Sequence, residues 1–234
     1  MQETIYTIPV TDAFSTPCEC PLCELHKKFE ADNINYYLGP SLMQPENRID
    51  TNDKGFCRRH FNQLLDSRAN RLGLGLVIDT YLQRQSVRMG KMANKPEDLI
   101  KYLKEHQTKC CICEKLDYTM DRYIEVILHQ WHKDEAFRAL LEKGLGFCTE
   151  HFTMLLEGAQ KYLGRSARKE FAQALIKMQL EQLERIEGDV NWFTKKFDYR
   201  FKDEPWKNSK DALERSIGKI VGYQGEDTPS RKNL

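Results

Sequence analysis

Two segments of the 234-residue sequence carry the same pattern of cysteine and histidine. The first has a CxxC motif at Cys20 and Cys23, followed by a CxxH motif at Cys57 and His60. The second repeats both motifs at nearly the same spacing, with Cys110, Cys113, Cys148 and His151. Three thiolates and one imidazole are the full ligand set of a closed tetrahedral zinc site. Each half of the sequence therefore predicts one Cys3His site, which gives two Zn²⁺ ions per chain.

The spacing within each motif explains how these side chains can reach one ion. Two cysteines separated by two residues can turn both sulfurs toward the same point, and residues at i and i+3 of a helix share one face. The amino end of a helix also stabilises a thiolate through its free N–H groups. The layout resembles that of treble-clef-type zinc modules. Because four protein ligands leave no position for water, we expect structural rather than catalytic ions.

Two other interpretations of the motifs stay open. The cysteines could be free thiols in a helical core, where such residues are common. They could also hold an iron–sulfur cluster in which histidine replaces a thiolate. Cys18 and Cys111 lie outside the shared pattern. They are either incidental or redox-active, since a spare thiol beside a metal-bound thiolate could form a disulfide and displace the metal.

A second set of metal-ligating residue types falls on one expected helix. Its members recur at i, i+4, i+8 and i+11, and they are Asp121, Glu125, His129 and His132. Carboxylates and histidines on helices can build a dinuclear centre in a bundle. A solvated helix face is the simpler interpretation, because more charged residues extend the same side and the first half has no matching set.

Residues 192–202 alternate aromatic side chains with cations. Such a segment could stack on the bases of a single-stranded nucleic acid and contact its phosphates. An arm whose aromatics pack against the protein body is the favoured interpretation. The 36 basic and 35 acidic residues give a formal charge of +1, which provides no overall attraction to nucleic acid or anionic lipid.

The composition is that of a globular protein, with 40% hydrophobic and 10% aromatic residues. The first residues lack the basic and apolar regions of a signal peptide, and the apolar stretch 72–82 is too short and interrupted to span a bilayer. We therefore expect a cytoplasmic protein with no membrane partner. In a reducing cytosol, eight cysteines are more often ligands than disulfides.

Hydrophobic periodicity predicts an all-α fold. Helices are expected over 21–38, from 57, over 72–92, through 116–131, from 148, over 166–187 and over 209–221, and no segment shows convincing period-two alternation. Residues 1–17 are expected to be extended or irregular, and the polar stretch 44–54 is expected to be a loop.

The duplicated motifs also suggest how the chain is organised. We expect a first zinc-helical repeat over residues 1–95, a second over 96–190, a C-terminal aromatic and basic arm over 191–223, and a disordered tail over 224–234. The two copies could pack about a pseudo-twofold axis. In that arrangement the long helices 72–92 and 166–187 would pair in a shared core.

Several motifs besides the paired Cys/His motifs point to a family. They are Ile8-Pro9-Val10, Lys196-Phe197-Asp198-Tyr199-Arg200 and Glu204-Pro205-Trp206. Together with the paired Cys/His motifs, they resemble an uncharacterised bacterial family known only as a domain of unknown function. The resemblance covers nearly the whole chain, and it implies one architectural unit but no activity or substrate.

The sequence favours a binding or adaptor module over an enzyme. It contains no glycine-rich phosphate loop, no nucleophile elbow and no HExxH motif. The expected partner is another protein, and the eight Cys/His ligands are the expected functional residues. A thiol-based redox sensor is the main alternative. A metal-dependent enzyme and a nucleic-acid-binding protein are weaker ones.

Overall fold

The computed structural model describes residues 5–223, and it confirms the all-α prediction for them. This part of the chain contains eleven α-helices, two short 3-10 helices and no strand. Within the described residues, no helix has both the length and the apolar character needed to cross a membrane. The tail predicted over residues 224–234 lies outside the described residues.

The helices group into two compact units. The terminal unit contains residues 5–27 and 120–223, and the middle unit contains residues 28–119. Helix α2 (Pro21–Leu38) begins in the terminal unit and ends in the middle unit, whereas α7 (Cys111–Lys133) does the reverse. The units are defined by contacts between helices, whereas the repeats are defined by sequence similarity along the chain. The units therefore do not test the repeat boundary near residue 95, which stays a prediction.

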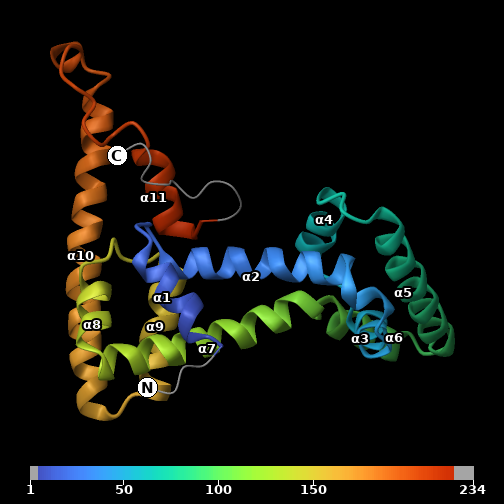
Figure 1. The fold of residues 1–234 in the computed structure, drawn as a ribbon. Coiled ribbons are helices and arrows are strands. Elements are labelled where there is room, and N and C mark those ends of the chain that lie inside the picture. Colours follow the sequence, from blue (N-terminus) through green and yellow to red (C-terminus); the bar gives the residue numbers. More distant parts are fainter. Residues whose placement is uncertain (1–4, 224–234) are drawn as a thin grey trace. The chain divides into compact units, whose positions relative to one another are not determined.

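The terminal unit contains most of the helical length. Besides parts of α2 and α7, it holds α1 (Thr7–Ser15), α8 (Glu135–Glu142), α9 (Thr149–Tyr162), α10 (Arg165–Lys195), η2 (Tyr199–Phe201) and α11 (Ala212–Val221). Helix α10 lies alongside α9 and α11 (Figure 1). The core is built on large side chains such as Trp131 and Phe171, whose rings meet edge to face at 5.0 Å.

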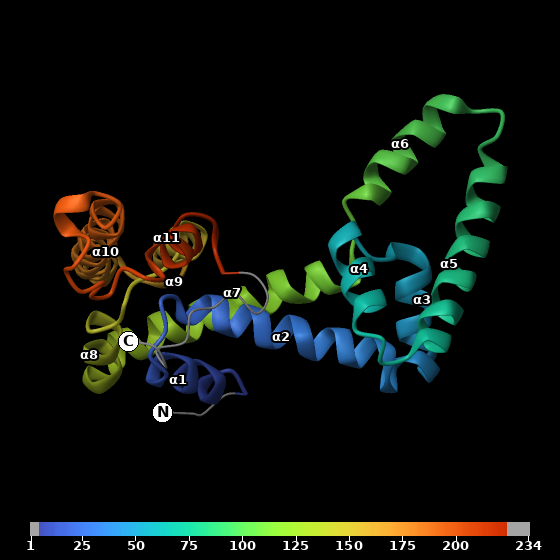
Figure 2. The ribbon, with the colours of Figure 1, turned by 90° about the horizontal axis from the view of Figure 1, so that it is seen from above.

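The middle unit has its own hydrophobic core. It contains η1 (Pro40–Met43), α3 (Pro45–Lys54), α4 (Arg58–Asp66), α5 (Arg71–Lys91), α6 (Pro96–Gln107) and the remaining parts of α2 and α7. Helix α3 packs along α5, and α6 leads back from the turn that follows α5 (Figure 2). The hydroxyl of Tyr81 on α5 lies 2.9 Å from Nε2 of His106 on α6.

Two segments expected to be irregular are helical. Residues 45–54 form α3, which begins at Pro45 and ends before Gly55, a residue with φ of +66°. Proline at the first helical position and glycine after the last are ordinary helix boundary signals, and they prevail over the polar composition. Residues 7–15 form α1, which buries Val10 and Phe14 one turn apart. Pro9 is tolerated because first-turn N–H groups have no partner within a helix.

The two long helices contribute to different cores, so the prediction of a shared core is wrong. Leu74 and Val77 of α5 belong to the core of the middle unit. Phe171 and Leu175 of α10 belong to the core of the terminal unit. Amphipathic periodicity identifies the buried face of a helix but not the element that covers it.

Candidate metal centres

The eight cysteine and histidine residues of the paired motifs gather into two clusters. Cluster A, in the terminal unit, consists of Cys20, Cys23, Cys148 and His151. Cluster B, in the middle unit, consists of Cys57, His60, Cys110 and Cys113. In each cluster the four candidate ligand atoms lie within 4.8 Å of one another, so both could hold a metal ion.

The grouping of ligands by sequence repeat is wrong. The order of the motifs predicted that Cys20 and Cys23 share an ion with Cys57 and His60. In the structure, each CxxC motif lies with the CxxH motif of the other repeat. Local geometry fixes the spacing within a motif, whereas the tertiary fold decides which motifs meet. The two CxxH motifs offer the same ligand atoms, so their chemistry gives no preference between them.

Both CxxH motifs use the same local structure. Cys57 and Cys148 are the N-cap residues of α4 and α9, with φ, ψ of −70°, 168° and −71°, 163°. The glycine two residues earlier is left-handed in both cases, with φ of +66° at Gly55 and +87° at Gly146. A glycine is favoured there because other residues rarely adopt this conformation. The repeated Gly-Phe pair therefore sets the chain direction before each helix that carries a CxxH motif.

The distances in cluster A fit a single tetrahedral ion. The sulfurs of Cys23 and Cys148 are 3.7 Å apart. Nδ1 of His151 lies 3.5, 3.3 and 3.2 Å from the sulfurs of Cys20, Cys23 and Cys148. A tetrahedron with metal–sulfur bonds of about 2.3 Å has sulfur–sulfur edges of about 3.8 Å. One ring nitrogen cannot hydrogen-bond to three sulfurs at once, so a shared ion explains this packing better than hydrogen bonds do.

Cluster B has the same dimensions. The sulfurs of Cys57 and Cys113 are 3.8 Å apart. Nδ1 of His60 lies 3.3, 3.2 and 3.4 Å from the sulfurs of Cys57, Cys110 and Cys113. Burial raises the pKa of Cys110, but the neighbouring His60 ring and the backbone of Cys113 and Cys57 together outweigh it and lower that pKa to about 6. The resulting thiolate is the form of cysteine that binds metal.

A carboxylate orients the histidine of cluster B. Nε2 of His60 donates to Glu30 Oε1 at 2.9 Å, and Gln63 Nε2 donates to Glu30 Oε2 at 2.9 Å. Arg59 also contacts this carboxylate. A proton held on Nε2 leaves Nδ1 directed at the three sulfurs with its lone pair free. Metal-binding histidines are oriented in this way in many proteins. No spacing rule pointed to Glu30, which lies on α2.

The end of α11 covers cluster A. The backbone N–H of Tyr223 donates to the sulfur of Cys23 at 3.5 Å, and a β-carbon placed on Gly222 would lie 3.8 Å from the sulfur of Cys148. Nζ of the buried Lys219 donates to the backbone carbonyl of Leu145 at 2.5 Å. The C-terminal arm therefore contacts the two cysteine motifs of cluster A directly.

Buried ion pairs attach this arm next to Cys20. Glu19 is 2% exposed and its Oε2 lies 2.6 Å from Arg185 Nη2 and 3.3 Å from Lys219 Nζ. Arg215, which is 1% exposed, pairs with Asp189 on α10 at 2.9 Å. Buried charges need such partners because leaving one unpaired is costly. In the sequence, only the four-residue spacing of Arg215 and Lys219 indicates this network.

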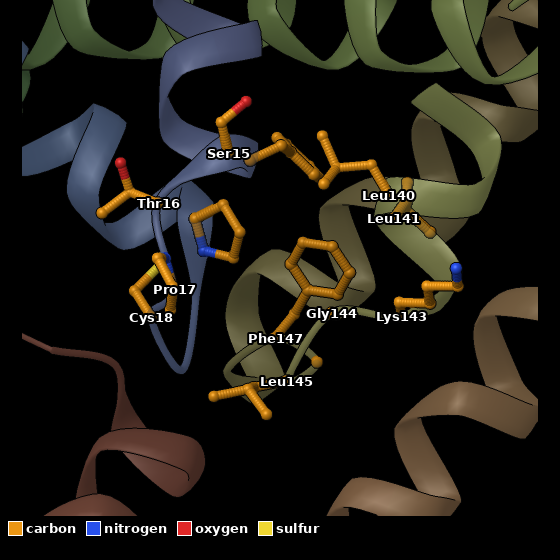
Figure 3. Close-up of a pocket in the computed structure, with 13 residues that line it drawn as sticks. Ser15, Thr16, Pro17, Cys18, Leu140, Leu141, Lys143, Gly144, Leu145 and Phe147 are labelled. Atoms are coloured by element: carbon orange, nitrogen blue, oxygen red, sulfur yellow. The ribbon is translucent and has the colours of Figure 1, made fainter. Parts of the chain in front are cut away.

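The two remaining cysteines are not part of either cluster, and all eight cysteines are free thiols. Cys18 lines a cavity of about 150 Å³ beside Pro17 and Phe147 (Figure 3). Burial raises the pKa of Cys18 to about 11, and burial also raises the pKa of Cys111. Neither residue has the low pKa that marks a reactive thiol.

The residues proposed for a dinuclear site do not assemble into one. Within the described chain, neither of the two groups that could hold metal includes them. Asp121 accepts hydrogen bonds from Lys161 at 2.8 Å and Tyr162 at 2.7 Å, and Glu125 pairs with Arg122 at 2.7 Å. The two histidines of this set, His129 and His132, are exposed. This arrangement agrees with the solvated helix face.

The aromatic and basic arm folds on itself. Trp192 Nε1 donates to the carbonyl of Pro205 at 2.9 Å, and Lys207 Nζ lies 3.8 Å from the centre of the Trp192 ring. Lys196 Nζ donates to the carbonyl of Phe201 at 2.7 Å. These contacts use cations and rings that a nucleic acid would need. Tyr199 remains exposed.

Comparison with known proteins supports the resemblance seen in the sequence. A family model described as a family of unknown function (DUF6062) matches residues 1–227. No curated protein and no solved structure matches the chain. The match extends over both clusters and the C-terminal arm, so the family model includes every residue of the two candidate centres.

Proposed function

The chain belongs to the DUF6062 family, and since this membership assigns no activity, we propose from the two clusters that it is a zinc-binding adaptor. In this role, two Zn²⁺ ions hold the helices in place and the resulting surface binds a protein partner. The proposed ligands are Cys20, Cys23, Cys148 and His151 in cluster A, and Cys57, His60, Cys110 and Cys113 in cluster B.

The sulfur–sulfur distances are the main support for this proposal. Values of 3.7 and 3.8 Å match the edge of a tetrahedron around one zinc-sized ion. The four ligands of an iron–sulfur cluster are divided among two or more irons, so they would not all lie as close together as the four ligand atoms here, which are within 4.8 Å of one another. Sulfur-rich sites with one imidazole also favour zinc over magnesium or calcium, which prefer oxygen.

The donor set favours a structural role. A bound Zn²⁺ would supply a cross-link among four side chains, with no position open for substrate or water. Residues of the chain support both sites, because Glu30 orients His60 and the end of α11 contacts Cys23 in cluster A. Metal sites of this type contribute directly to the free energy of folding.

The described residues offer little support for the other functions. The cavity beside Cys18 is lined by mostly apolar residues, with Lys143 as its one charged side chain. It therefore lacks the pair of titratable groups that acid–base catalysis needs. Nucleic-acid binding is weakened by the internal use of Lys196 and Lys207. We place the adaptor in the cytoplasm because cysteines that bind metal or stay outside disulfides suit a reducing compartment.

Elemental analysis of the purified protein tests the proposal. We expect two zinc atoms per chain, and the double variant Cys18→Ser/Cys111→Ser should retain both because neither thiol belongs to a cluster. Removing the metal with a strong chelator should lower the melting temperature and the helical signal in circular dichroism. A protein purified without metal, or one whose melting temperature is unchanged by chelation, would rule out structural zinc.

A further inference from the structure

The two clusters differ in how far solvent can reach them. In cluster A all four side chains are buried, with exposed fractions of 0% for Cys20, 4% for Cys23, 0% for Cys148 and 5% for His151. In cluster B, Cys110 and His60 are equally buried, but Cys57 and Cys113 are only half-buried. The same donor set therefore occurs once with four buried residues and once with two half-buried ones.

Cluster A is closed by a segment far away in sequence. Tyr223 contacts Cys23 through its backbone N–H, and its hydroxyl donates to the carbonyl of Arg215 at 2.8 Å, which holds the residue against α11. Thr149, the residue after Cys148, donates to the carbonyl of Lys219 at 3.2 Å. The end of α11 therefore lies directly against the cysteines of cluster A.

Cluster B opens onto a cavity of about 400 Å³, and Cys57 forms part of its wall. The cations of the wall are Lys54, Arg58 and Lys109, and none of the described residues that line it is aspartate or glutamate. Phe56 and Leu103 supply apolar surface. A small oxidant in this cavity would lie next to Cys57, the one residue of cluster B among the described residues that line it.

We propose that cluster B is an oxidant-sensitive metal site and that cluster A is a permanent one. The inference rests on the proposed function in one respect, that both clusters hold a metal ion. Cys57 reacts first because it lines the cavity, and Cys113 is its partner because their sulfurs are 3.8 Å apart and both residues are half-buried. The class of reactant is a hydroperoxide, for which hydrogen peroxide is the simplest example.

The reaction takes place in two steps. The Cys57 thiolate attacks one oxygen of hydrogen peroxide, the O–O bond breaks, and the products are a sulfenic acid and hydroxide. The Cys113 thiolate then attacks the Cys57 sulfur, a disulfide forms, and a second hydroxide leaves. In total, two thiolates lose two electrons and one peroxide is reduced to two hydroxide ions. A disulfide no longer provides two thiolate ligands, so cluster B releases its ion.

This assignment differs from a sensor built on the spare cysteines. Cys18 is 8% exposed and Cys111 is 1% exposed, so both are less accessible than Cys57. Oxidation follows exposure as well as thiolate character. The reactive pair is therefore placed among the metal ligands themselves.

Peroxide titration of the zinc-loaded protein tests the proposal, with a chromogenic zinc chelator reporting released metal. We expect one zinc equivalent to leave at least about tenfold faster than the second. The oxidised protein is then denatured, its remaining thiols are alkylated, and its peptides are analysed by mass spectrometry. Cys57 and Cys113 should be joined by a disulfide, and the three cysteines of cluster A should be alkylated. Release of both equivalents at one rate, no release at excess peroxide, or earlier oxidation of Cys20, Cys23 or Cys148 would overturn the proposal.

A glycine substitution provides a second test that leaves the ligands unchanged. A β-carbon on Gly218 would lie 2.0 Å from the Tyr223 ring, so Gly218→Ala should displace the residue that covers cluster A. In this variant we expect both zinc equivalents to respond to peroxide. The matched control Gly188→Ala, which has no atom within 4 Å of the new carbon, should still release one. A protein with no zinc would refute the proposed function, whereas equal release of two zinc ions would refute only this inference.

Discussion

The crossed pairing of the motifs can be tested by combining cysteine substitutions. Cys20 and Cys148 belong to the same cluster, whereas Cys20 and Cys57 belong to different ones. The double variant Cys20→Ser/Cys148→Ser damages one cluster and should retain one tightly bound zinc per chain. The double variant Cys20→Ser/Cys57→Ser damages both clusters and should retain none. Ligation within each sequence repeat would give the opposite result for each variant.

The same variants predict a difference in stability. Losing one ligand removes most of the folding free energy supplied by a site, which is of order 10 kcal/mol for a structural zinc in small domains. Substituting a second ligand of the same site then costs little more, so Cys20→Ser and Cys148→Ser should be strongly non-additive. Cys20→Ser and Cys57→Ser lie in different units, so their effects should add to within about 0.5 kcal/mol.

The assay is zinc content by mass spectrometry after gel filtration in the presence of a weak chelator, followed by urea unfolding of each variant. Single variants serve as references, and each should retain one tightly bound ion. One zinc in the Cys20/Cys57 variant together with none in the Cys20/Cys148 variant would refute the crossed arrangement. Additive losses for Cys20→Ser and Cys148→Ser would refute their membership of one site.

Three further substitutions follow from individual contacts. Glu30→Gln should weaken zinc binding at cluster B by about 10- to 100-fold in a chelator competition while cluster A keeps its affinity, because the histidine loses its orienting carboxylate. Arg215→Met should lower the urea-derived free energy of unfolding by about 3 kcal/mol, since it removes the cation paired with Asp189, and adding Asp189→Asn should recover part of that loss. Gly158→Ala should lower the free energy of unfolding by about 2 kcal/mol in the same assay, because its β-carbon would lie 2.2 Å from a side chain of α7. The control Gly75→Ala has open space around the new carbon and should cause no loss of stability.

The sequence identified the helices and the ligand types because both depend on short-range spacing. The helix predicted over 21–38 has the same bounds as α2, and the expected helix 72–92 differs from α5 by one residue at each end. All eight predicted ligands occur in the clusters. These features follow from periods of three to four residues, which a single sequence displays directly.

Features that depend on long-range packing could not be predicted in the same way. The cover of cluster A joins Tyr223 to Cys23, and no periodic pattern links residues so far apart. Glu30 resembles any other acidic residue of an exposed helix until the fold brings His60 beside it. Helix α3 could have been predicted in place of the expected loop, because Pro45 and Gly55 mark its ends in the sequence itself.

The crossed motifs also place one ligand loop inside the other. Cluster B joins residues 57–113, and this interval lies wholly between the ligands Cys23 and Cys148 of cluster A. The inner loop spans 56 positions and the outer one 125, so closing the inner one is favoured by about 0.7 kcal/mol of chain entropy. Once it is closed, the outer loop is effectively shorter. We therefore expect cluster B to form before cluster A. When only the first 119 residues have left the ribosome, every ligand of cluster B is present but only half of those of cluster A.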